Sequence, residues 1–307
     1  MKSFMVKFVA ALSVIALVGI ALSLSGCAAA PKSWSAGTGE IKIVASTNIW
    51  ASIAAEAAGK DVVTAEALIY NINQDPHSFE ASARDQLLVN QADIVVVNGG
   101  GYDEFMTTLV EAAEAQPTVL NAVDLVGTRE DGNEHIWLDV DRVRKFGELV
   151  NAEIQKIRPD LADELAKNLQ AFNSNIDDLA AKQAEVKEKT KGLKVIQTES
   201  LVSYLLEDTG MIDATPVEMT EAVEGERDIP PLAMKEVQDL IDAGEISAII
   251  APFGGHESDS PQWTGGVVNL GFYEILGQDD DTYEQYDKTY FEYVNSCLMT
   301  LQLASEL

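Results

Sequence analysis

The stretch from residue 160 to residue 191 contains neither glycine nor proline. Its apolar side chains recur at three- and four-residue steps, which predicts one amphipathic helix about 45 Å long. The positions of this apolar stripe are Leu161, Leu165, Leu169, Phe172, Ile176, Leu179 and Val186. Such a helix divides the 307-residue chain into two parts, and a chain of this length is long enough for two lobes.

Short β-branched runs alternate with helical patterns on both sides of this helix. Strands that alternate with helices indicate parallel sheets with helices on their faces. The expected strands cover 41–45, 61–68, 93–97, 118–121, 193–197, 246–251 and 267–270. The expected helices cover 50–58, 82–91, 103–115, a segment from 201, and 282–304. The sequence therefore predicts an α/β fold with two similar lobes, residues 40–159 and 192–307, joined by the long helix as a rigid backbone.

The N-terminus has the pattern of an export signal. Lys2 and Lys7 give a basic start, and an almost unbroken apolar run covers residues 8–24. This run is short for a membrane-spanning anchor, which is the less favoured alternative. Leu24-Ser25-Gly26-Cys27 resembles a bacterial lipobox, in which the cysteine is lipidated and becomes the new N-terminus. We therefore expect a signal peptide over 1–26, a lipid-anchored flexible tether over 27–39, and an extracytoplasmic location at the membrane.

The charge balance excludes some classes of partner. The chain has 21 Lys and Arg against 50 Asp and Glu, a formal net charge of −29. Nucleic acid and anionic lipid surfaces require a basic footprint, so neither is expected as a partner. Only two cysteines are present, which excludes a dense disulfide framework. The second, Cys297, falls in helical step with apolar and aromatic residues, so we expect a buried thiol.

Four metal-competent side chains follow predicted strands. His77 and His135 come after the second and fourth strands of the first lobe, and Glu199 and Glu274 follow strands of the second. Ligands of open α/β sheets bind beyond the carboxyl ends of the strands, so a cleft between the lobes would bring these four together. Two imidazoles and two carboxylates suit Zn²⁺, Mn²⁺ or Fe²⁺, and four protein ligands fit binding better than catalysis. Each residue alone is weak evidence, since a single loop histidine is more often a surface or hydrogen-bonded residue and some of the 50 acidic residues follow strands by chance.

Other polar features have simpler interpretations. His256 lies in a Gly- and acid-rich loop, where a solvated loop is favoured over a metal gateway. The acidic runs 129–134 and 279–281 are interpreted as solvated faces, with weak steering of cations as the alternative. The sequence contains no HExxH, GxxxxGK[ST] or GxSxG motif, and no GxGxxG after a strand.

Four segments in order resemble one known family, the metal-binding lipoproteins of zinc and manganese ABC transporters, cluster A-I with the TroA-like fold. They are Ser46-Thr47-Asn48-Ile49-Trp50, Asp75-Pro76-His77-Ser78-Phe79-Glu80, Asn98-Gly99-Gly100-Gly101-Tyr102-Asp103 and His135-Ile136-Trp137-Leu138-Asp139. The resemblance extends from about residue 41 to the C-terminus and is looser after residue 210. It implies two α/β lobes that hold one transition-metal ion between them.

The resemblance also implies the ligands. His77 and His135 match the family's two first-lobe histidines, and Glu199 matches its third ligand. Glu274 is the best match to the fourth ligand, usually an Asp, with Glu257 and the 279–281 run as fallback positions. Glu80 and Asp139 are the nearest acceptors in sequence for the imidazole N–H groups. The ion is expected to be Zn²⁺ or Mn²⁺, with Fe²⁺ as a further possibility. The absence of the His-rich loop found in many zinc members mildly favours Mn²⁺.

The function implied is capture of a divalent metal ion by a monomer and delivery to the membrane permease and cytoplasmic ATPase of an ABC importer, with no enzymatic step. One alternative is a surface adhesin or structural lipoprotein whose metal stabilises the fold. Another is a metal-dependent hydrolase that uses Glu199 as its base, which predicts an open coordination position.

Overall fold

The computed structural model describes residues 34–225, 227–252, 263, 267–276 and 289–306. Several expectations therefore lie outside the described residues. They are the signal peptide over 1–26, the lipidation site Cys27, most of the tether, His256, Glu257, the 279–281 run and the first residues of the last helix. Within the described part, no helix combines the length and apolarity needed to cross a bilayer.

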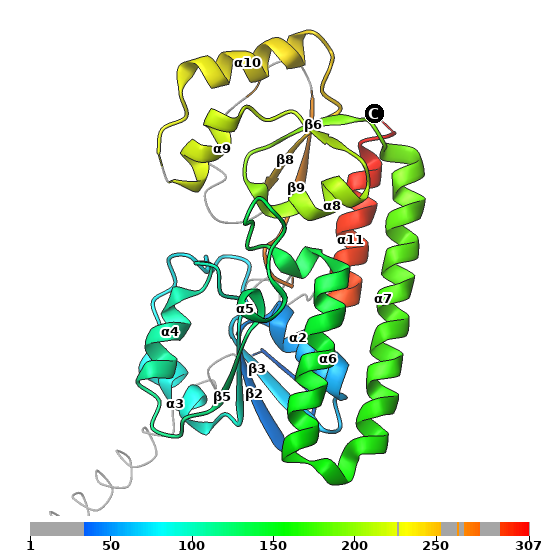
Figure 1. Cartoon of the computed structure of the whole chain (residues 1–307). Helices are drawn as coiled ribbons and strands as arrows, with labels where there is room; N and C mark the ends of the chain where they lie inside the picture. The colour runs from blue at the N-terminus through cyan, green and yellow to red at the C-terminus, as the bar shows by residue number, and fades with distance from the viewer. Residues whose placement is uncertain (1–33, 226, 253–262, 264–266, 277–288, 307) are drawn as a thin grey trace, which may run out of the picture. The chain divides into compact units, whose positions relative to one another are not determined.

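The first lobe contains a five-stranded sheet in the order β1-β3-β2-β4-β5 (Figure 1). Its strands are β1 (Trp34–Ala36), β2 (Ile41–Thr47), β3 (Val63–Ile69), β4 (Ile94–Val97) and β5 (Thr118–Asn121). Strands β2 to β5 pair in parallel, as predicted, and only β1 is antiparallel to its neighbour. The carboxyl ends of the four parallel strands therefore open at one edge of the sheet.

Both faces of this sheet are buried. Ile43 and Ala45 of β2 belong to the main apolar core, whereas Val44 between them faces a second cluster that includes Met106. Helices α2 (Asn48–Ala58) and α6 (Val140–Ile157) contribute to the main core, and α3 (Ala83–Gln91) and α4 (Glu104–Glu111) to the second cluster. Apolar side chains at successive strand positions are the pattern expected when helices cover both faces.

The tether predicted over 27–39 is wrong at its C-terminal end. Trp34–Ala36 form strand β1, which pairs with Ala65–Ala67 of β3. Trp34 is buried at 6% exposure and packs into the main core. A short antiparallel strand at an edge was hidden in the sequence because three residues are too few for a period-two pattern.

The long helix predicted over 160–191 is confirmed. Pro159–Leu161 form a 3-10 turn, and α7 continues without interruption over Ala162–Thr190. Helix α6 runs antiparallel beside α7 (Figure 1). This helix was not predicted from the sequence. Asp139 caps α6 by accepting the backbone N–H groups of Asp141 and Arg142.

The second lobe contains a parallel four-stranded sheet in the order β7-β6-β8-β9. Its strands are β6 (Lys194–Gln197), β7 (Ile212–Asp213), β8 (Ala248–Pro252) and β9 (Val268–Phe272). Its helices are α8 (Ser203–Asp208), α9 (Val217–Glu224) and α10 (Pro231–Asp242), preceded by the 3-10 turn Ser200–Val202. The α/β class with parallel sheets and a long helix is thus the one predicted, although β7, α9 and α10 were not assigned.

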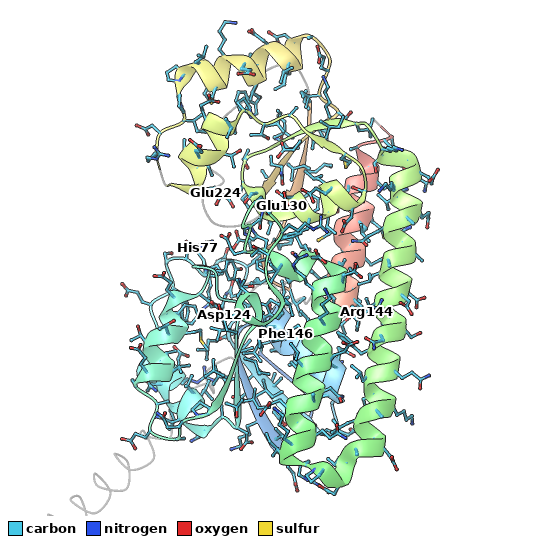
Figure 2. All side chains as sticks on the ribbon, in the orientation of Figure 1. His77, Asp124, Glu130, Arg144, Phe146 and Glu224 are labelled. Carbon is cyan, nitrogen blue, oxygen red and sulfur yellow. The ribbon has the colours of Figure 1, made fainter. Side chains whose placement is uncertain are left out.

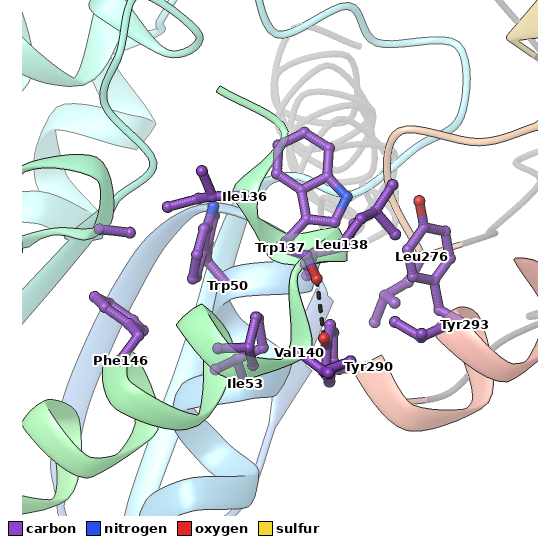
Figure 3. Close-up of a cluster of buried hydrophobic side chains, with 14 of the residues drawn as sticks. Trp50, Ile53, Ile136, Trp137, Leu138, Val140, Phe146, Leu276, Tyr290 and Tyr293 are labelled. Carbon is purple, nitrogen blue, oxygen red and sulfur yellow. Dashed lines mark hydrogen bonds between the residues drawn. The ribbon is translucent and has the colours of Figure 1, made fainter. Parts of the chain in front are cut away.

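The described C-terminal part provides a second connection between the lobes. After β9 the chain reaches the first lobe, where the backbone N–H and C=O of Leu276 bond to the Asn48 side chain at 2.9 and 3.0 Å. Helix α11 (Tyr290–Leu303) then packs along α7, and Tyr290 donates its hydroxyl to the Trp137 carbonyl (Figure 3). Cys297 on α11 is buried, as predicted.

Candidate metal centre

His77 lies in the loop that follows β3, at the carboxyl edge of the first sheet. Asp75 shapes this loop, since its carboxylate accepts the backbone N–H of His77 at 2.9 Å and the hydroxyl of Ser78 at 2.7 Å. The His77 side chain is exposed, and its ring stands edge-on to Tyr102 with centroids 5.1 Å apart. It lies where the two lobes meet, toward Glu224 of the second lobe (Figure 2).

His135 is the buried imidazole of the pair, at 3% exposure. It precedes the 3-10 turn Ile136–Leu138, and its ring packs edge-on against Trp137 at 5.1 Å and Tyr102 at 5.9 Å. Burial, with a smaller contribution from the nearby His77, lowers the pKa of His135 to about 3. The imidazole is therefore neutral at physiological pH, which is the form that binds metals.

The structure brings the two predicted histidines together and adds Glu134, which was not predicted as a site residue. Ligand atoms of His77, Glu134 and His135 all lie within 4.8 Å of one another. Glu134 is half-buried, so the interpretation of 129–134 as a solvated face is wrong for this residue. The available signal was its position directly before His135, which the acidic composition of the run concealed.

Glu199 lies directly after β6, as predicted, and is half-buried. Burial raises the pKa of Glu199, and the neighbouring Glu224 raises it further, whereas His77 lowers it. Glu134, Glu199 and Glu224 line one cavity of about 320 Å³ between segments of the two lobes. The cavity also contains polar groups of the loop 131–133.

Glu274 follows β9 at the carboxyl edge of the second sheet. Its Oε2 accepts the Tyr102 hydroxyl at 3.4 Å, so Tyr102 contacts both imidazoles and this carboxyl group. Burial raises the pKa of Glu274 to about 8, and the charges of Glu199 and Asp75 contribute to that rise. Two carboxylates in a partly dehydrated site repel each other, and a bound cation would relieve this repulsion.

The predicted partners of the imidazole N–H groups differ in the structure. The Nδ1 atom of His135 lies 2.8 Å from the side-chain oxygen of Asn133, not beside Asp139. The Asp139 carboxylate instead binds Arg129 and Arg142 and caps α6. Glu80 is exposed. Asn133 is closer in sequence to His135 than Asp139 is, and it precedes the 3-10 turn Ile136–Leu138, whereas Asp139 lies beyond that turn.

Comparison with known proteins bears on this geometry. The profile of the family described as zinc-uptake complex component A, periplasmic (ZnuA), matches residues 43–255. This match covers well over half of the chain. The chain belongs to this family. The resemblance stated from the four sequence segments is thereby confirmed, and the match includes His77, His135 and Glu199.

Curated relatives of the family are less completely covered. The manganese-binding lipoprotein MntA of Halalkalibacterium halodurans is 31% identical over 167 residues, 52% of this chain and 54% of the relative. The metal ABC transporter substrate-binding lipoprotein ScbA of Streptococcus cristatus is 28% identical over 182 residues, 55% of this chain and 57% of the relative. The chain thus spans just over half the length of these relatives.

Solved structures confirm the fold. The solute-binding protein FpvC of Pseudomonas aeruginosa, solved with Mn²⁺, superposes with a TM-score of 0.70 at 21% identity, covering 87% of this chain and 98% of that one. The periplasmic zinc-binding protein TroA of Treponema pallidum gives 0.70 at 19% identity, covering 87% and 99%. The TroA-like architecture predicted from the sequence is therefore correct.

Proposed function

We propose that this chain captures one divalent transition-metal ion, Zn²⁺ or Mn²⁺, between its two lobes and delivers it as cargo to an ABC importer. The observation that carries the proposal is the convergence of His77 and His135 at the carboxyl edge of one sheet, opposite the half-buried Glu199 and Glu274 of the other lobe. The electrostatic interaction between the two glutamates supports a cation between them.

Cargo binding is favoured over catalysis. Four protein donors from two lobes leave no designed open position, whereas catalytic zinc sites keep one for water or substrate. The names of MntA and ScbA describe a manganese-binding lipoprotein and a metal ABC transporter substrate-binding lipoprotein, which also supports transport over an adhesive or purely structural role.

Release of the ion is proposed to involve local movement of the 199 and 274 segments. Helix α7 joins the lobes along the chain, and two described parts of the C-terminal region add contacts: Leu276 bonds to the Asn48 side chain, and α11 packs on α7 and α2. A connection of this kind opposes wide hinge opening. Transport at the membrane further requires the lipid anchor expected at Cys27 and a permease with its ATPase.

Metal titration of the purified, chelator-treated chain tests the proposal, with Zn²⁺ and Mn²⁺ in competition. We expect one ion per chain, and loss of binding in the double variant His77→Ala/His135→Ala. The exposed Glu130→Gln serves as the control, because it removes a charge from the loop before His135 without removing a donor. Stoichiometric, tight binding by the double variant would show that the ion binds elsewhere.

A further inference from the structure

The spacing of Glu134 relative to the histidines is close to that of ligands on one ion. Three atoms bonded to one ion at about 2.1 Å can all be separated from one another by at most about 3.6 Å. The ligand atoms of His77, Glu134 and His135 already lie within 4.8 Å of one another. An inward shift of each ligand atom by less than about 1 Å, which side-chain rotation can supply, would therefore place all three on one ion.

The backbone around Glu134 is held in place by the glycine-rich loop that follows β4. The side-chain amide of Asn98 donates to the Glu134 carbonyl at 3.1 Å. Gly100 has a φ of +69°, and a Cβ added there would lie 3.1 Å from the Cβ of Glu134. A glycine at this position thus lets the loop pack closely against the Cβ atom of Glu134. This contact fixes the base of the side chain that carries the carboxylate.

The environment of Glu134 also requires a counter-charge. Glu134 is half-buried and lines its cavity together with the carboxylates of Glu199 and Glu224. Among the described residues that line its cavity there is no Lys or Arg. An ionised carboxylate in such a place is stabilised by a cation at the position that the two imidazoles already share.

We propose that Glu134 is a direct metal ligand, the third carboxylate of the site beside Glu199 and Glu274. This inference rests on the proposed function and goes beyond it by assigning a metal preference. With His77 and His135, the site then offers five side-chain donors, of which three are carboxylates. Structural Zn²⁺ sites are almost always four-coordinate, whereas oxygen-rich sites of higher coordination number suit Mn²⁺. Glu134 therefore shifts the selectivity of this chain from Zn²⁺ toward Mn²⁺.

The isosteric variant Glu134→Gln tests the assignment, because it removes the charge and keeps the shape. Two matched variants each remove one negative charge nearby. Glu224→Gln removes a charge that lines the same cavity but lies outside the group formed by His77, Glu134 and His135, and Glu130→Gln removes an exposed charge from the same loop. Affinities for Mn²⁺ and Zn²⁺ are measured by competition titration, and the oxygen ligands of bound Mn²⁺ are counted by X-ray absorption spectroscopy.

We expect Glu134→Gln to weaken Mn²⁺ binding by about tenfold or more and Zn²⁺ binding by clearly less, as for loss of one hard ligand. Bound Mn²⁺ should show an altered oxygen shell in this variant alone. If Glu134→Gln and Glu224→Gln lower the affinities for Mn²⁺ and Zn²⁺ equally, the assignment is overturned. Glu134 would then act only through its charge. Slower Mn²⁺ association with unchanged affinity would overturn it too. If the unmodified chain binds neither ion, the proposed function itself fails, which is a distinct result.

Discussion

The side-chain oxygen of Asn133 lies 2.8 Å from Nδ1 of His135 and also accepts the backbone N–H of that histidine at 2.8 Å. The Asn133 amide nitrogen donates to the carbonyl of Ser200 in the second lobe at 2.7 Å, so the orientation of the amide is fixed. An amide oxygen can only accept, so Nδ1 carries the proton and Nε2 keeps its lone pair for an ion. One side chain thus orients a ligand and links it to the segment that follows Glu199.

Asn133→Ala and Asn133→Asp separate these two roles. Alanine removes the acceptor at His135, and we expect metal affinity to fall by about tenfold or more, as for loss of other groups that orient ligands. Aspartate keeps an acceptor for His135, replaces the donor to Ser200 with an oxygen and adds a negative charge, so its affinity should stay closer to that of the unmodified chain. Isothermal titration with the preferred ion measures both. Equal losses in the two variants would indicate that the contact with Ser200 is the important one.

Asp139 provides the opposite case, because it supports the fold and not the imidazole. Its buried carboxylate binds Arg129 and Arg142, and Arg129 also bonds to Glu207 and Asp208 of the second lobe. We expect Asp139→Asn to lower the free energy of unfolding by about 2–4 kcal/mol, since two guanidinium groups lose their shared partner. Asp139→Ala should cost about 1 kcal/mol more, because it also removes the cap of α6.

Chemical denaturation of the metal-free protein measures these losses, and titration shows whether the site is affected. The metal affinity of folded Asp139→Asn should stay within about threefold of the unmodified value. Removal of a group that contacts a ligand is expected to lower the affinity by about tenfold or more. A much larger loss of affinity with little loss of stability would restore Asp139 as a partner of the metal site.

The Asn48 side chain holds the segment that carries Glu274. It is fully buried and bonds to both the N–H and the C=O of Leu276. We expect Asn48→Ala to destabilise the metal-free protein by about 2–4 kcal/mol, since it leaves two buried backbone groups without these bonds. Metal affinity should fall as well, because Glu274 lies two residues before Leu276 and loses its fixed position.

Thermal unfolding with and without metal checks this prediction. The matched variant is Asn168→Ala, whose amide donates to the Ala58 carbonyl away from the site. It should lower stability without a change in metal affinity. If Asn48→Ala binds metal as tightly as the unmodified chain, the Leu276 contact does not position Glu274.

The sequence was informative about residues that come directly after a strand, because the strand determines where such a residue lies in the fold. The expected strands ended near the observed ends, and a donor that follows a parallel strand must lie at one edge of the sheet, so His77 and Glu199 were found at the predicted edges. The long helix was also predictable, because α7 carries its apolar stripe over many turns.

Tertiary contacts were not predictable in the same way. The role of Asn133 and the position of Glu134 depend on how one loop folds back between the lobes, and local composition made that loop resemble a solvated acidic run. Trp34 likewise joins the sheet through pairing with Ala67 of β3, 33 residues further along the chain. Such pairings leave no periodic signal in a single sequence.

The carboxyl group of Glu274 makes the stability of the metal-free protein depend on pH. Its pKa is raised to about 8 from 4.5, so between these values the unfolded chain is ionised while the folded chain keeps the proton. The free energy of unfolding therefore falls as pH rises through this window, by up to a few kcal/mol at about 1.4 kcal/mol per pKa unit. Glu274→Gln mimics the protonated group, so it should match the metal-free protein at pH 5 and melt several degrees higher at pH 8.5.

Calorimetric melting in chelator at both pH values measures this difference, with Glu188→Gln on the exposed face of α7 as the control. Added metal should stabilise the unmodified chain at pH 8.5 much more than the variant, because the ion replaces the proton that the carboxylate has lost. Identical melting temperatures for Glu274→Gln and the metal-free protein at pH 8.5 would mean that ionising this carboxyl group costs nothing in the folded state.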